Sequence, residues 1–220
     1  MKRALTLGLL VMSMAAFTQA SDKKLEKAIA AEAEPLGFTQ VKNRFLDRVY
    51  FNPNINLKEY QQLQFTDLDV SKIEVRQPPE SYTRFNEPWV LNDKDRAYLQ
   101  KKYLEQFNKE LIDSGDFKAA GGAGKTLLIK STLLEIAPSA VKDDIQSRNM
   151  EKIYTEGAGT MNIRMEIYDA QTNALIGLVG DQSDLGNRWQ ENNRPNNQRE
   201  VSLAFSRWAT SLGHALNGKR

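Results

Sequence analysis

Residues 160–180 read TMNIRMEIYDAQTNALIGLVG and contain the clearest strand pattern of the chain. The first half alternates strictly between apolar and polar side chains, and its apolar residues are Met161, Ile163, Met165 and Ile167. Such alternation is typical of a strand that buries one face and leaves the other in water. Residues 169–173 are typical of a turn, in which Asn173 can adopt a positive φ. Because residues 174–180 return as a second strand, the stretch predicts a β-hairpin.

Two other segments have the periodicity of amphipathic helices. The first covers about residues 94–112, where Asn92 or Asp93 can cap the start. Its apolar side chains recur every fourth residue, at Leu99, Tyr103, Phe107 and Leu111. The second helix begins near Gln198, and its apolar stripe consists of Val201, Phe205, Trp208, Leu212 and Leu216. A single apolar stripe must pack against a core, so we expect this stripe to face the apolar side of the hairpin.

Further extended segments complete the predicted fold. Residues 60–75 change their apolar face between Phe65 and Leu68, which suggests a β-bulge. Residues 126–137 have apolar side chains at both odd-numbered and even-numbered positions, which fits a strand that is covered on both faces. Residues 44–51 alternate too irregularly to be assigned. The predicted loops are residues 76–90 and 181–198, and residues 138–155 are predicted to be a loop or a short helix. The elements predict an α+β domain, in which a mixed, mostly antiparallel sheet of about four or five strands carries both amphipathic helices on one face.

The first twenty residues have the organisation of a secretory signal peptide. Lys2 and Arg3 give a positive start, and residues 4–16 form an uncharged, largely apolar run. The run is too short for a bilayer span, which takes about 20 apolar residues. The alternative is a retained N-terminal anchor. We expect cleavage after Ala20 and a periplasmic protein with no integral membrane segment. No cysteine follows the cleavage point, so lipid attachment is not expected there.

Cleavage also divides the chain and changes its charge. We expect residues 21–43 to be a loosely attached arm and residues 44–220 to form a single α+β domain. Removing Lys2 and Arg3 from the 30 basic residues leaves 28, which equals the 28 acidic residues. Since no overall basic field remains, nucleic acid is not an expected partner. The absence of cysteine and the presence of one histidine exclude disulfides, thiolate metal sites and multi-histidine metal sites.

The stretch AAGGAGKT, residues 119–126, ends like a phosphate-binding loop. Such a loop must leave a strand and open a helix, because its amides then point at phosphate with the helix dipole behind them. Here the order is reversed, since a predicted helix precedes the loop and a strand begins at Thr126. We therefore interpret the stretch as a flexible glycine linker, in which Lys125 does not bind nucleotide.

The sequence contains only weak signals for catalytic side chains. His214 lies away from the apolar stripe of the second helix, so it is expected to face solvent. Paired carboxylates can bind a cation or hydrolyse glycosidic bonds, and the chain offers two such pairs, Asp67 with Asp69 and Asp181 with Asp184. Neither pair lies in an EF-hand or another motif with the spacing of metal ligands, and both are interpreted as ordinary surface charge. We therefore predict no catalytic, cofactor-binding or metal-binding residue.

Other polar and aromatic residues have two possible roles. The polar face of the first hairpin strand consists of Arg164, Glu166 and Tyr168. We expect salt-bridged or helix-covered sheet surface there, with a binding surface as the alternative. Trp89 and Trp189 lie in predicted loops. They could anchor a partner or fold back onto the core.

Several of these stretches resemble one bacterial family. YFNPNINLKEYQQLQFTDLDV (50–70) resembles the opening of the family, and EGAGTMNIRMEIYDAQTNALIGLVGDQSD (156–184) resembles its hairpin. The segment from Val201 to Leu216 is similar to its final helix. The family is the bacterial envelope domain of unknown function numbered 3313, and the resemblance covers about residues 44–217. It implies an extracytoplasmic α+β domain without a known activity. Many members resemble lipoproteins with a cysteine at the cleavage site, and this chain departs from them there.

These observations lead to a functional expectation. We expect a non-enzymatic periplasmic protein that binds a partner or supports an envelope assembly. The expected partner is an envelope protein or a cell-wall component, and no nucleotide is expected. The alternative is a hydrolase or carbohydrate-active enzyme that uses carboxylates. A pocket that gathers two acids with raised pKa values would favour the enzyme, whereas an exposed apolar patch or an unpaired sheet edge would favour the binding protein.

Overall fold

The computed structural model describes residues 22–78, 88–113, 117–140 and 152–218. The predicted signal peptide, residues 1–20, lies outside the described residues. Residues 22–33 are helical, and the two longer helices are α3 (Asp93–Asn108), which a π-helical turn continues over Lys109–Asp113, and α4 (Arg194–Leu216). The strands are β1 (Thr39–Gln40), β2 (Arg48–Phe51), β3 (Tyr60–Phe65), β4 (Glu74–Val75), β5 (Lys118–Ala119), β6 (Lys125–Pro138), β7 (Tyr154–Glu156), β8 (Gly159–Asp169), β9 (Leu175–Asp184) and β10 (Trp189–Glu191). Short 3-10 helices cover Glu34–Leu36 and Leu57–Glu59.

The main sheet has eight strands, more than the four or five predicted. Its order is β1-β2-β9-β8-β6-β3-β5, with β4 also paired to β6. The neighbouring strands β1, β2, β9, β8 and β6 pair antiparallel in that spatial order, whereas β3 and β4 run parallel to β6. The sheet is therefore mixed and mostly antiparallel, as predicted. The count was wrong because strands of two residues, such as β1, β4 and β5, are too short to show a sequence period.

The hairpin at the centre of the sheet is confirmed. In its turn, Asn173 has a φ of 54°, and the Asp169 carboxylate accepts hydrogen bonds from the backbone N–H groups of Gln171 and Thr172. Beyond the turn, β9 extends to Asp184, past the end predicted at residue 180. The predicted loop 181–198 therefore contains the end of β9, the short strand β10 and the start of α4.

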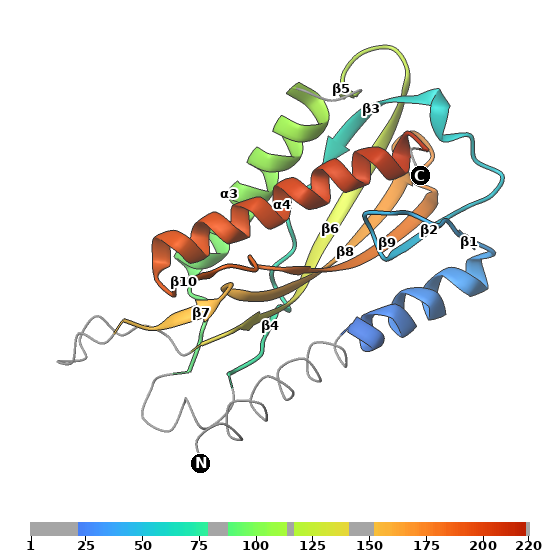
Figure 1. Cartoon of the computed structure of the whole chain (residues 1–220). Coiled ribbons are helices and arrows are strands. Elements are labelled where there is room, and N and C mark those ends of the chain that lie inside the picture. The colour runs from blue at the N-terminus through green and yellow to red at the C-terminus, as the bar shows by residue number, and fades with distance from the viewer. Residues whose placement is uncertain (1–21, 79–87, 114–116, 141–151, 219–220) are drawn as a thin grey trace.

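Both long helices cover the same face of the sheet (Figure 1). Asn92 caps α3 in a capping box with Asp95, and Asn193 caps α4 by accepting a hydrogen bond from the backbone N–H of Asn196. The sheet contributes Met161, Ile163, Met165 and Ile167 to the core, and α4 contributes Phe205, Trp208 and Leu212. All seven are at most 2% exposed. The expected packing of hairpin against helix is thus confirmed.

The opposite face of the sheet carries the helix of residues 22–33. Its Leu25, Ile29 and Ala33 are buried with Tyr50 of β2 and Leu178 of β9. Gly180 permits the close approach, since a Cβ atom there would lie 2.5 Å from Cγ1 of Ile29. The sequence analysis expected residues 21–43 to be a loosely attached arm, whereas the helix in this segment packs on the sheet. A stripe of three apolar residues among charged ones is too sparse to predict it. The domain boundary at residue 44 stays a prediction.

The segment after β3 also differs in detail from the expectation. β3 ends at Phe65, and Asp69 then forms an isolated bridge with Thr132, so the chain leaves and rejoins β6 between these points. Within β3, the irregular pairing with β6 lies earlier, between Tyr60 and Gln62. No helix among the described residues is long and apolar enough to cross a membrane.

Candidate functional site

A groove lies between the C-terminal half of α4 and the end of β9. It has a volume of about 600 Å³, and its lining includes Asp181, Trp208, His214 and Phe45. On one side Arg207 donates hydrogen bonds to Ser183 Oγ, at 3.0 Å, and to the backbone oxygen of Asp184, at 2.6 Å. The groove therefore brings together two of the side chains that the sequence analysis considered, Asp181 and His214.

Asp181 is buried at the base of this groove, and not on the surface as predicted. Its Oδ2 accepts a hydrogen bond from Trp208 Nε1 at 2.8 Å, and its Oδ1 accepts one from the backbone N–H of Asp47 at 3.0 Å. Burial raises the pKa of the Asp181 carboxyl to about 7, against the opposing effect of these hydrogen bonds. Such a group could exchange a proton near neutral pH. However, both of its oxygens already accept bonds from the protein, so its evident role is to hold Trp208 in place.

His214 is half-buried, which corrects the expectation that it faces solvent. Its ring packs on Phe45, with the ring centroids 4.8 Å apart and the planes tilted by 51°. Its Nδ1 is buried without a hydrogen-bond partner among the described residues. The helical phase correctly placed His214 off the apolar stripe, but Phe45 comes from the loop before β2 and covers it from outside the helix.

The remaining candidate carboxylates do not form a site. Asp67, Asp69 and Asp184 are exposed. Asp69 accepts hydrogen bonds from Ser71, which lower the pKa of its carboxyl. Within the described ranges, no group of three or more acidic or histidine side chains could hold a metal ion.

The glycine-rich stretch has the order that the sequence predicted. Residues 120–124 form bends that lead directly into β6, so no helix follows the glycines. Lys125 Nζ pairs with Glu59 Oε2 at 2.6 Å, and Gln62 Nε2 donates to the backbone oxygen of Ala123 at 3.0 Å. The loop is thus joined to β3 and lacks the helix N-terminus that phosphate binding requires.

Replacing Lys125 with alanine should leave the midpoint of urea denaturation nearly unchanged. The ion pair with Glu59 is solvent-exposed on both sides, and such pairs contribute little to stability. Calorimetric titration with ATP should give no binding to either protein. Millimolar or tighter binding that disappears with Lys125→Ala would contradict the linker interpretation.

The polar face of β8 is covered, as expected. Arg164 forms ion pairs with Glu166 and with Glu32 of the helix that covers residues 22–33. Tyr168 donates a hydrogen bond to Glu166 at 3.1 Å. This network joins the sheet to the N-terminal helix, so the structure favours the structural reading over a binding surface.

The two candidate tryptophans have opposite environments. Trp89 folds back, with its Nε1 donating to the backbone oxygen of Ala140 at 2.8 Å and its backbone paired with the Gln77 side chain. Trp189 is 72% exposed. It begins β10, which pairs with β7 in a separate two-stranded ribbon. Trp189 is therefore the more accessible of the two candidate tryptophans.

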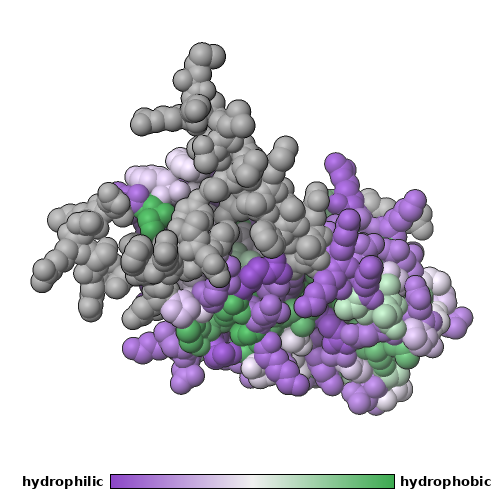
Figure 2. Space-filling view, turned by 90° about the horizontal axis from the view of Figure 1, so that it is seen from below, coloured by the Kyte–Doolittle hydropathy of each residue, from purple (hydrophilic) through white to green (hydrophobic). Residues whose placement is uncertain are grey.

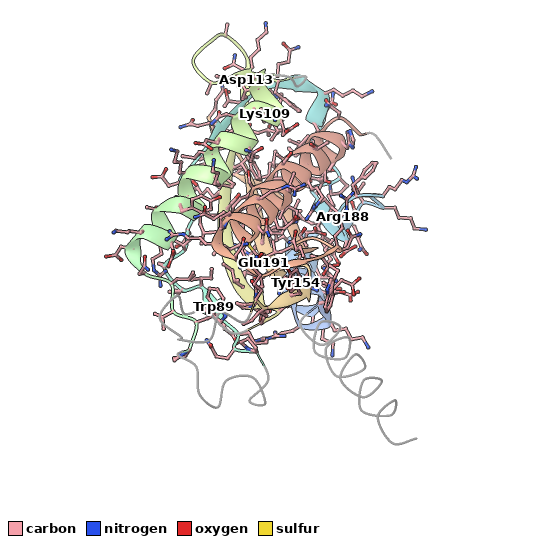
Figure 3. All side chains as sticks on the ribbon, turned by 60° about the vertical axis from the view of Figure 1, so that its left-hand side comes forward. Trp89, Lys109, Asp113, Tyr154, Arg188 and Glu191 are labelled. Carbon is pink, nitrogen blue, oxygen red and sulfur yellow. The ribbon has the colours of Figure 1, made fainter. Side chains whose placement is uncertain are left out.

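The exposed face of the β7–β10 ribbon combines aromatic and acidic side chains. Trp189 lies opposite Glu156, and Glu191 lies opposite Tyr154, which is 46% exposed. Lys152 Nζ pairs with Glu191 at 3.1 Å on the same face. Figure 3 shows Tyr154 and Glu191 together near the N-terminal end of α4. The sequence analysis considered Trp189 but missed its neighbours, because strands of three residues give no readable alternation.

Comparison with known proteins agrees with the resemblance found in the sequence. A family model described as a protein of unknown function (DUF3313) matches residues 37–212. The chain belongs to the DUF3313 family. Membership of DUF3313 confirms the predicted family but assigns no activity, and no curated protein matches the chain.

A comparison with solved structures found only weak similarity to this DUF3313 chain. Protein XCC0632 from Xanthomonas campestris is 14% identical, with a TM-score of 0.41, over 80% of this chain and 92% of that one. A PelC dodecamer from Paraburkholderia phytofirmans is 9% identical, with a TM-score of 0.31, over 76% and 95%. A putative neuraminyllactose-binding hemagglutinin homolog from Helicobacter pylori is 13% identical, with a TM-score of 0.31, over 82% and 92%. At these TM-scores the likeness supports no conclusion about function.

Proposed function

We propose that this DUF3313 protein is a non-enzymatic periplasmic protein that binds a partner through the exposed face of the β7–β10 ribbon. The observation that carries the proposal is the exposure of Trp189 and Tyr154 on one face of this ribbon. Aromatic side chains bury large areas at little entropic cost, and they dominate binding hot spots. An indole that is 72% exposed loses favourable burial unless a ligand covers it.

In the view from below the molecule, the described surface is mainly hydrophilic, with small separate groups of hydrophobic residues (Figure 2). The enzymatic alternative has less support. Asp181 is the buried acid of the groove, and both of its carboxylate oxygens already accept hydrogen bonds from the protein.

The proposed location rests on the sequence of residues 1–20. We expect N-terminal sequencing of the exported protein to begin at Ser21, because the small residues before that point match the preference of signal peptidase. Exported protein that begins at Met1 would contradict the proposal and would favour the retained anchor.

Site-specific cross-linking tests the binding face directly. A photo-reactive residue in place of Trp189 should give covalent adducts of raised mass in living cells. A matched control places the same residue at Leu203, an exposed apolar position on α4 that is 40% accessible. Equal adduct formation at both positions, or none at Trp189, would show that the ribbon is not the binding face.

A further inference from the structure

The exposed face of the β7–β10 ribbon has a sharply alternating composition. Lys152, Tyr154 and Glu156 are exposed, whereas Ile153 and Thr155 between them are half-buried. On β10, the same outer face carries Trp189 and Glu191, and Gln190 points the other way. Side chains of one face that lie diagonally across two strands are about 7–8 Å apart. Trp189 and Tyr154 stand in this relation, so the face offers two adjacent aromatic rings.

This face is held in place at both ends. The backbone N–H of Asn192 donates to the oxygen of Ile153 at 2.7 Å, and that of Gly157 donates to the oxygen of Arg188 at 3.0 Å. The Asn196 side chain in the first turn of α4 donates to the backbone oxygen of Glu191 at 2.8 Å. A two-stranded ribbon is marginal by itself. The first two bonds extend its pairing beyond both ends, and the Asn196 bond ties it to α4. A pre-organised face loses little entropy when it binds a ligand.

The face carries one ion pair and one further carboxylate. The Lys152 ammonium pairs with Glu191, which lowers the pKa of the Glu191 carboxyl. Glu156 has no ion pair among the described residues and lies directly opposite Trp189. A carboxylate beside an exposed indole offers hydrogen-bond acceptors next to an apolar plane. The Glu156 carboxylate repels phosphate-bearing ligands, which disfavours nucleic acid and anionic lipid headgroups as occupants.

The dimensions of the face also restrict the occupant. Three residues of a strand span about 10 Å, which is the length of two linked sugar rings. A stable protein–protein interface takes about 20–30 residues a side, whereas the two strands of the ribbon have three residues each. Sugar rings present C–H groups on one side, which stack on aromatic planes, and hydroxyl groups at their edges, which donate to carboxylates.

We propose that this face binds a neutral glycan strand, with one sugar ring stacked on Trp189 and a second on Tyr154 while Glu156 accepts hydroxyl hydrogen bonds. The proposal rests on the binding function proposed above and names the class of its ligand. A partner that inserts a lysine or arginine side chain over Trp189 is the competing possibility, since cations also favour aromatic faces beside carboxylates.

The test uses the purified protein with a β-1,4-linked N-acetylglucosamine tetramer as one probe and trilysine as the other, both followed by calorimetric titration. The wild type should bind the sugar and not trilysine. Trp189→Ala should weaken sugar binding by about tenfold or more, whereas Trp189→Phe should retain most of it. Leu203→Ala is the matched control and should bind as the wild type does.

Glu156→Gln separates the two ligand classes, because glutamine keeps an acceptor oxygen but removes the charge. Sugar binding that survives this substitution within about threefold supports a neutral glycan. Wild-type protein that binds no sugar, or binds it equally with Trp189→Ala, overturns the glycan proposal, and so does binding of trilysine that Glu156→Gln abolishes. If cross-linking at Trp189 still captures a partner in cells, the binding function stands and only the ligand class is wrong. If cross-linking also fails, both proposals are wrong.

Discussion

Replacing Trp208 with alanine should leave the domain marginally stable or unfolded. The indole is 2% exposed, and its ring lies 5.8 Å from that of Phe205 between centroids. Truncation of a buried tryptophan costs about 3–5 kcal/mol in packing. It also removes the donor to the buried Asp181 carboxyl, which costs about 1–3 kcal/mol more. The total stability of a typical domain is about 5–15 kcal/mol. Urea denaturation followed by circular dichroism measures the loss.

Two variants serve as controls for this result. Trp208→Phe keeps an aromatic ring but removes the pyrrole half of the indole with its N–H group, so its loss should exceed that of the hydrogen bond alone and stay below that of Trp208→Ala. His214→Ala removes a half-buried ring that contacts Phe45, and should cost about 0.5–1.5 kcal/mol. A greater loss with His214→Ala than with Trp208→Ala would contradict this assignment of the core and would make His214 the more important residue of the groove.

The Asp181 carboxyl should make the protein less stable as the pH rises from about 4 to about 7. Its pKa is raised from 3.8 to about 7 in the folded state. Between these values the unfolded chain has lost the proton and the folded chain still holds it, so the free energy of unfolding falls with increasing pH. Each unit of pKa difference corresponds to about 1.4 kcal/mol, which gives about 4 kcal/mol over the whole window.

Asp181→Asn isolates this contribution, because asparagine is neutral at every pH in the window. Relative to the wild type, the variant should become steadily more stable between pH 4 and pH 7.5. The carboxyls whose pKa values are lowered, such as those of Asp169 and Glu59, titrate in both proteins and cancel in the comparison. A difference between the two proteins that does not change with pH would show that Asp181 is ionised in the fold throughout.

The sequence predicts those parts of the fold where one face of an element is buried and the other is wet. The hairpin strand with Met161 to Ile167 and the stripe of α4 are of this kind, and their mutual packing followed from the short connection between them. Strand β2 is different. Its four residues, Arg48–Phe51, are all buried, because Tyr50 belongs to the second core while Val49 and Phe51 belong to the first. A strand that is covered on both faces has no alternation to recognise.

The candidate site is less predictable than the fold, because it depends on contacts between distant segments. Asp181 and Trp208 were each recognised as notable residues, but their hydrogen bond is a property of the folded chain. Phe45 covers His214 from another part of the sequence, and no helical phase can show this. The ribbon of Trp189 and Tyr154 consists of two strands with three residues each, which lie below the length at which periodicity is informative.

The helix of residues 22–33 affects how the chain can assemble. Its Glu32 pairs with Arg164, 132 positions further along the chain, and its Ile29 packs on Gly180 of β9. Contacts between such distant positions form late, because closing a long loop costs entropy before any contact compensates for it. We therefore expect the helix to complete its docking only after β8 and β9 have paired. Until then, Tyr50 and Leu178 remain uncovered, and the nascent chain exposes an apolar surface that can aggregate. The speed with which this one helix docks thus sets how long the newly made protein is vulnerable.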